Sequence, residues 1–136
     1  MEQMSKYGSL VGRILLSLIF LMAVYGKITD FGGTQGYMAS RGMPATALLA
    51  FLAIIIELGG GLSVLLGYKA RLGAFALFVF LIPATLIFHT TLGGEFAPEQ
   101  AWVQPYMVMK NLAIMGGLLV VAAHGAGPLS MDGKGA

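Results

Sequence analysis

Residues 45–66 read ATALLAFLAIIIELGGGLSVLL, an almost unbroken apolar run that is long enough to cross a membrane as one helix. Three similar runs lie before and after it, and we expect the four spans at residues 9–26, 45–66, 72–89 and 104–123. In lipid, backbone polar groups must be paired within the protein, so apolar runs of this length become helices. The sequence therefore predicts an all-α integral membrane protein, a four-helix transmembrane bundle that forms a single domain over residues 1–136.

The composition of the chain also favours a membrane location. Hydrophobic residues make up 57% of the chain and charged residues only 10%, whereas a soluble domain carries about 25% charged residues. So few charges cannot cover a water-soluble globule, which argues against a soluble enzyme. The net charge of +2 does not indicate nucleic-acid binding, because the basic residues are scattered and serve membrane topology.

The residue inventory limits the chemistry that the chain can carry out. There is no cysteine, which excludes disulfides, thiolate nucleophiles and iron–sulfur clusters within this chain. His89 and His124 are expected at opposite ends of the membrane, so they cannot bind one haem iron. We therefore expect no metal site.

The connections between the spans predict how the chain is oriented. Five basic residues gather at one end of the predicted helices: Lys6, Arg13, Lys69, Arg71 and Lys134. Because the more positive end stays cytoplasmic, we expect both termini in the cytoplasm. Residues 33–41 predict a short helix on the outer face, with Thr34 as its N-cap and Gly42 as its stop. The Gly-rich tail from Gly125 onward is expected to be loose.

Arg13, Glu57 and Lys110 interrupt the apolar runs, and Asn111 follows Lys110. A charge at the bilayer centre costs about 2.5–3.5 kcal/mol, so such residues are paired, hydrated or functional. Along ideal helices, Glu57 lies roughly 14 Å deep, between Arg13 on one side and Lys110 on the other. We expect Glu57 to pair with one of these two cations, and the sequence does not select which. This network is the candidate catalytic site; its alternative role is to fix the helix register.

A second polar cluster is expected at the outer ends of the helices. Tyr25, Lys27 and His89 all fall there, and together with Asn111 they are the candidate binding residues. The alternative for Lys27 is a topology anchor, and the alternative for His89 is an ordinary interfacial residue.

Glycines adjoin the candidate network. Gly59, Gly60 and Gly61 follow Glu57, and Gly116 and Gly117 offer a matching small surface on the fourth span. Small residues let membrane helices approach closely, so we expect tight packing of the second span against a neighbour.

Short motifs are spread along almost the whole chain. They include Gly12-Arg13, Gly26-Lys27, Gly42-Met43-Pro44, Glu57-Leu58-Gly59-Gly60-Gly61, Leu66-Gly67-Tyr68, Pro83-Ala84-Thr85, Phe88-His89 and Met109-Lys110-Asn111. Together they resemble the DoxX family of small bacterial four-helix inner-membrane proteins. The recurrent polar positions of that family correspond here to Arg13, Lys27, Glu57, His89, Lys110 and Asn111.

The resemblance implies a function class. The family takes its name from subunits of a thiosulfate:quinone oxidoreductase, and this chain is most similar to members labelled quinol oxidase subunits. It is therefore expected to be a membrane subunit or accessory protein of a redox system. It would handle a quinone through its Arg/Glu/Lys network, beside a partner oxidoreductase subunit; no other cofactor is evident. Whether it catalyses alone is open. The alternatives are a small-solute transporter, which would need a homo-oligomer, and a membrane scaffold for a soluble oxidoreductase.

Overall fold

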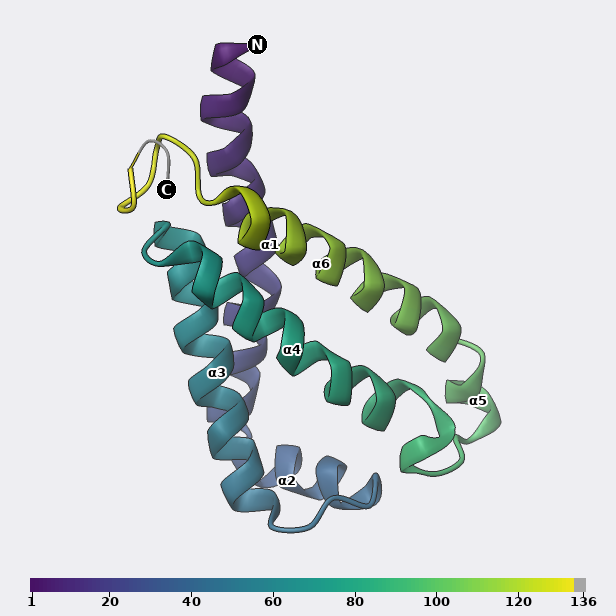
Figure 1. The fold of residues 1–136 in the computed structure, drawn as a ribbon. Helices are drawn as coiled ribbons and strands as arrows, with labels where there is room; N and C mark the ends of the chain where they lie inside the picture. Colours follow the sequence, from purple (N-terminus) through teal and green to yellow (C-terminus); the bar gives the residue numbers. More distant parts are fainter. Residues whose placement is uncertain (134–136) are drawn as a thin grey trace.

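The computed structural model of this protein describes residues 1–133, and helices are its only regular secondary structure over that range. The long helices are α1 (Glu2–Thr29), α3 (Thr46–Leu66), α4 (Ala70–His89) and α6 (Gln104–His124) (Figure 1). The short helices are α2 (Phe31–Ser40), the 3-10 turn η1 (Thr91–Gly93) and α5 (Pro98–Ala101). Lys134, one of the basic residues that predict the orientation, lies outside the described residues.

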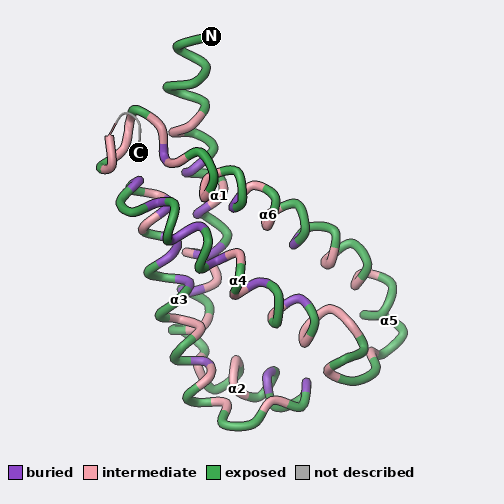
Figure 2. Tube along the Cα trace, viewed as in Figure 1, coloured by how far each residue is buried: buried purple, intermediate pink, exposed green. Residues whose placement is uncertain are grey.

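The helices confirm the predicted fold class. Within residues 1–133, four helical segments are long and apolar enough to cross a membrane. Large apolar side chains such as Leu15, Phe51 and Leu72 are more than half exposed, and exposed residues line the outer sides of the long helices (Figure 2). Such a surface is suited to lipid and not to water, so the protein contacts the bilayer. The cytoplasmic location of the two termini stays a prediction.

The four long helices form an open arc. α1 packs along α3, α3 packs against α4, and α4 packs along α6, whereas α1 and α6 barely touch. In Figure 1, α4 and α6 incline away from α1 and α3, and α2 lies across the end opposite the termini. We call this the α2 end, and the opposite one the termini end. The arc therefore leaves an opening between α1 and α6.

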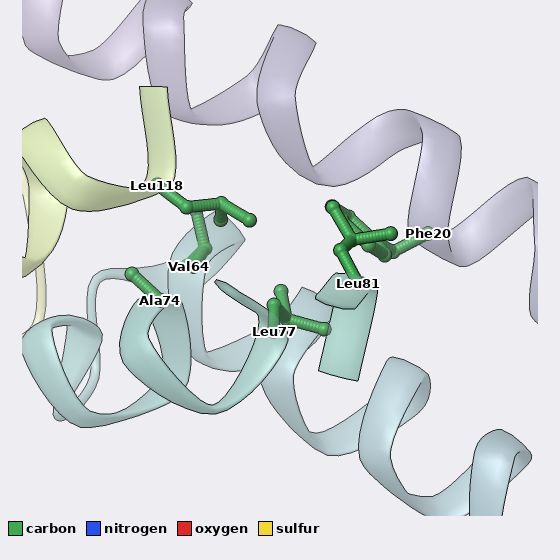
Figure 3. Close-up of a cluster of buried hydrophobic side chains, with 6 residues drawn as sticks. All are labelled: Phe20, Val64, Ala74, Leu77, Leu81 and Leu118. Carbon is green, nitrogen blue, oxygen red and sulfur yellow. The ribbon is translucent and has the colours of Figure 1, made fainter. Parts of the chain in front are cut away.

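The buried core is formed by side chains from all four long helices. It consists of Phe20, Val64, Ala74, Leu77, Leu81 and Leu118 (Figure 3). Gly60 of α3 makes this packing possible, because a Cβ there would lie only 2.5 Å from Cγ of Leu77 on α4. The predicted close approach at the second span is therefore confirmed, and its neighbour is α4. Gly116 takes no part in it, since a Cβ there would meet nothing within 4 Å.

Arg13 ties the C-terminal tail to the termini end. Its Nε donates to the carbonyl oxygen of Ala126 at 2.9 Å, and its Nη1 donates to those of Val64 at 3.2 Å and Leu65 at 2.8 Å. Its Nη2 donates to the carbonyl oxygen of Leu129. Arg13 is only 2% exposed. Carbonyl oxygens at the C-terminal end of α3, where the helix dipole is negative, thus help to stabilise this charge.

Asp132 fixes the same tail to α4. Its carboxylate accepts hydrogen bonds from the backbone N–H groups of Lys69 at 2.7 Å and Ala70 at 2.9 Å, which caps the first turn of that helix. The backbone N–H of Met131 also donates to the carbonyl oxygen of Leu66 at 3.0 Å. The prediction of a loose tail is therefore wrong for residues 125–133, because side chains distant in sequence bind its backbone.

At the α2 end, Arg41 plays a similar connecting role. Arg41 donates from Nε to the carbonyl oxygen of Ile87 at 3.0 Å and from Nη2 to that of Thr90 at 2.7 Å. Its guanidinium lies 4.0 Å from the ring centre of Phe96. These contacts join the connection after α2 to the end of α4.

The short helix α2 begins earlier than predicted. Its N-cap is Asp30 and not Thr34, because the Asp30 carboxylate accepts a hydrogen bond from the backbone N–H of Gly33 at 3.1 Å. Gly42, with φ of +83°, follows the helix end as predicted.

Candidate functional site

A cavity of about 770 Å³ lies inside the arc, next to α2. It is lined by residues of α1, α2, α3, α4 and α6, and its walls are mostly apolar, with Phe20, Met38, Ile56, Phe80 and Ile114 among them. Ligand pockets typically enclose about 300–1,000 Å³. Five of the predicted polar residues lie on this wall: Lys27, Glu57, His89, Lys110 and Asn111.

Lys27 and Glu57 form an ion pair on the cavity wall. Nζ of Lys27, in the last turn of α1, lies 2.6 Å from Oε1 of Glu57 in the middle of α3. The Glu57 side chain is 5% exposed and that of Lys27 is 23% exposed. No hydrogen bond within residues 1–133 satisfies Oε1 besides this contact. Oε1 is itself fully buried. Of the roughly four acceptor positions of a carboxylate, those on Oε2 are therefore the ones that remain for a molecule in the cavity.

The predicted pairing of Glu57 with Arg13 or Lys110 is wrong. Arg13 binds carbonyl oxygens at Val64 and Leu65, which lie about 10–12 Å farther along α3 from Glu57. Lys110 is on α6, which packs on α4 and so lies across the cavity from α3. The long side chain of Lys27 instead reaches from the last turn of α1 to Glu57 in the middle of α3. The predicted Arg/Glu/Lys network is thus replaced by a Lys27–Glu57 pair.

Two polar contacts join α4 to α6 beside this pair. Nδ2 of Asn111 donates to Oγ1 of Thr85 at 2.9 Å, and both residues are buried. Nδ1 of His89 lies 2.8 Å from Oε1 of Gln104. The sequence analysis assigned no role to Thr85 or Gln104. The available signal was that Thr85 and Asn111 are both polar residues inside apolar spans.

Lys110 and Tyr25 differ from the other candidates. Lys110 lines the cavity but is exposed, and its ammonium has no acidic or hydrogen-bonding partner in the described part of the chain. Tyr25 is 69% exposed and is absent from the cavity wall. The structure therefore brings Lys27, Glu57, His89, Lys110 and Asn111 to one cavity, and leaves Tyr25 on the outer surface.

The chemistry that this cavity offers follows from its wall. Within residues 1–133 no group of three or more histidine, aspartate or glutamate side chains is arranged to hold a metal ion. The wall instead presents large apolar surfaces, the ammonium donors of Lys27 and Lys110, and the acceptor oxygens of Glu57. It is suited to an apolar molecule with one polar end that both accepts and donates hydrogen bonds.

Comparisons with known proteins agree with this architecture. The family model described as DoxX matches residues 8–90. The chain is 39% identical over 132 residues to the inner membrane protein YqjF of Escherichia coli, an alignment that covers 97% of this chain and 95% of that protein. It is 34% identical over 131 residues to the inner membrane protein YphA of the same organism, covering 90% of this chain and 86% of that protein. No solved structure matches. Four apolar helices and these relatives identify a multi-pass protein of the inner membrane.

Proposed function

This chain belongs to the DoxX family, and on that premise we propose that it is the quinone-binding subunit of a redox system in the inner membrane. The observation that supports this most directly is the cavity of about 770 Å³ with the Lys27–Glu57 pair on its apolar wall. A quinone such as ubiquinone has an apolar tail on a ring that carries two carbonyl oxygens at opposite positions. The cavity offers an environment of the same kind.

The ion pair suits both redox forms of such a ligand. The carbonyl oxygens of a quinone accept hydrogen bonds, and the ammonium of Lys27 is a donor. The hydroxyl groups of a quinol donate, and the carboxylate oxygen of Glu57 that can accept from them is Oε2, since Oε1 is buried against Lys27. In this proposal Glu57 takes one of the two protons of a bound quinol, the second proton is released to water, and a redox centre of a partner subunit takes the two electrons.

The proposal gives the predicted charged residues different tasks. Lys27 and Glu57 contact the ligand, whereas Arg13 holds the C-terminal tail through four carbonyl oxygens and does not reach this cavity. An Arg13 variant should therefore affect stability before it affects quinone binding. This separates the proposal from one in which a single network of three charged residues binds the ligand.

The test is equilibrium binding of decylubiquinone to the full chain in lipid nanodiscs, corrected for empty discs. Glu57→Gln should weaken binding at least about tenfold, because it removes a charged acceptor from a desolvated site. Glu99→Gln is the matched control, since Glu99 is exposed on α5 and outside the cavity. The affinity of Glu99→Gln for decylubiquinone should equal that of the wild type.

A second variant guards against a folding defect. The reversed pair, Lys27→Glu with Glu57→Lys, keeps one cation beside one anion but exchanges their positions, so its helices should stay packed while the ligand contacts change. If the wild-type protein holds no more decylubiquinone than an empty disc, or if Glu57→Gln binds as tightly as the wild type, the proposed function is wrong.

A further inference from the structure

A second cavity of about 800 Å³ lies between α1 and α6, nearer the termini end. We call it the α1–α6 groove; its wall runs from Gly8 to Ile19 on α1 and from Lys110 to Ala126 along α6 and the start of the tail. A helical stretch of this length spans about 20 Å. The side chains along it are mainly apolar, with Leu15, Leu16, Val120 and Val121 among them.

The groove adjoins the central cavity. Ile19, Lys110 and Ile114 line both of them, so the two spaces are neighbours. Lys110 is an exposed cation inside an apolar span, and no described residue offers it an acidic or hydrogen-bonding partner. An intramembrane charge without a protein partner indicates a ligand site or a hydrated path.

Resting on the proposed function, we propose that the α1–α6 groove holds the isoprenoid tail of the quinone and is its lateral way in from the bilayer, and that Lys110 donates a hydrogen bond to the ring. The ring then lies in the central cavity, between the Lys27–Glu57 pair on one side and Lys110 on the other. The ligand class is thereby narrowed to a tailed quinone, with the tail directed toward the termini end.

The packing of α1 against α6 supports a lateral way in. These two helices touch much less than the other neighbouring pairs do, and within the groove the flexible side chain of Leu16 faces Gly117. A tail can therefore enter between them by displacing side chains such as Leu16, with the backbone of both helices in place. Gly12 adds room at the middle of the groove, since a Cβ there would meet nothing within 4 Å. Arg13 and Ala126 also line the groove, and the hydrogen bond from Arg13 Nε to the carbonyl oxygen of Ala126 joins α1 to the start of the tail there. A small water-soluble solute has no apolar part that would bind in this second apolar space.

The test compares two probes on the full chain in nanodiscs: decylubiquinone, and the same benzoquinone ring with a methyl group in place of the tail. Gly12→Leu fills the groove without a clash at Cβ and should weaken decylubiquinone binding at least about tenfold while leaving the ring probe unchanged. Gly116→Leu adds the same bulk to α6 outside both cavities, where Cβ again meets nothing within 4 Å, and should change neither probe.

Lys110 is tested with the same probes. Lys110→Met should weaken both by a similar factor, because the ring carries the contact, and Lys6→Met, at an exposed site outside both cavities, is the control. Retention of wild-type affinity for both probes would overturn the role of Lys110.

The outcomes separate this inference from the function on which it rests. If the wild type binds neither probe, the proposed function fails and the inference fails with it. If the wild type binds both and Gly12→Leu leaves decylubiquinone unchanged, or weakens both probes alike, the groove is not the tail site although the function stands. If native mass spectrometry shows that Gly12→Leu disrupts an oligomer, a second copy of the chain occupies the groove and the inference is overturned.

Discussion

Removal of the Arg13 guanidinium should destabilise the protein and release its C-terminal tail. In Arg13→Met, the carbonyl oxygens of Ala126 and Val64 lose their buried hydrogen bonds, while those of Leu65 and Leu129 are only partly buried and can be hydrated. A buried acceptor left unpaired costs about 1–3 kcal/mol. Relief of guanidinium desolvation offsets part of this cost, so we expect a loss of about 2–4 kcal/mol in the free energy of unfolding.

Two measurements report on this change. The free energy of unfolding follows from reversible SDS-driven unfolding in mixed micelles, monitored by far-UV circular dichroism. Hydrogen exchange with mass spectrometry follows the backbone N–H groups of Met131 and Asp132, which donate to the carbonyl oxygens of Leu66 and Gly67. Arg13→Met should raise exchange at these tail amides more than within the core of α4.

Two further variants show which property of Arg13 matters. Lys6→Met removes an exposed cation from the same helix and should change the stability by less than about 0.5 kcal/mol. Arg13→Lys keeps the charge but loses the planar fork of donors, so it should recover only part of the stability. If the free energy of unfolding of Arg13→Met lies within about 0.5 kcal/mol of the wild-type value and its tail amides stay protected from exchange, the hydrogen bonds of Arg13 do not stabilise the protein.

Three other substitutions follow from the packing. Gly60→Ala should destabilise the protein by about 1–3 kcal/mol, since its Cβ would lie 2.5 Å from Cγ of Leu77. The control Gly59→Ala has open space at Cβ and should be neutral or stabilising. Equal changes in the free energy of SDS-driven unfolding for the two variants would contradict the close approach of α3 and α4. Asp132→Ala removes the cap of α4 and should cost about 0.5–2 kcal/mol, with faster exchange at the first turn of α4; unchanged exchange there would count against the cap. Arg41→Met removes the hydrogen bonds to the carbonyl oxygens of Ile87 and Thr90 and the contact with the Phe96 ring. Proteolytic cleavage within residues 90–97 should therefore become several-fold faster. An unchanged cleavage rate would show that other contacts hold this loop.

The membrane class and the helix positions could be read from the sequence because they depend on local composition. The apolar run around Glu57 is long enough for one span whatever its neighbours are, and the structure places α3 at Thr46–Leu66. The same local reasoning identified Glu57 and Lys27 as polar residues worth attention. It could not pair them, because depth along ideal helices neglects the reach of a lysine side chain and the order in which helices pack.

The tail shows where sequence reasoning fails. Glycines after residue 125 predict a loose segment, but the ordering groups are the side chain of Arg13 and the first amides of α4, both far away in sequence. Only Asp132 carried a local signal, as an acidic residue able to cap a helix. The cavity was likewise hidden, because it arises where α1 and α6 fail to pack, and no single segment reveals a missing contact.

The most direct test of the central claim, that the cavity beside the Lys27–Glu57 pair binds a quinone, is photolabelling with a quinone that carries an azide on its ring, followed by peptide mapping. The account predicts that the label falls on cavity-lining residues such as Phe80 and Ile87 and is displaced by excess decylubiquinone. Label that instead spreads over lipid-facing residues such as Phe51 and Phe75, or that excess decylubiquinone does not displace, would contradict the claim.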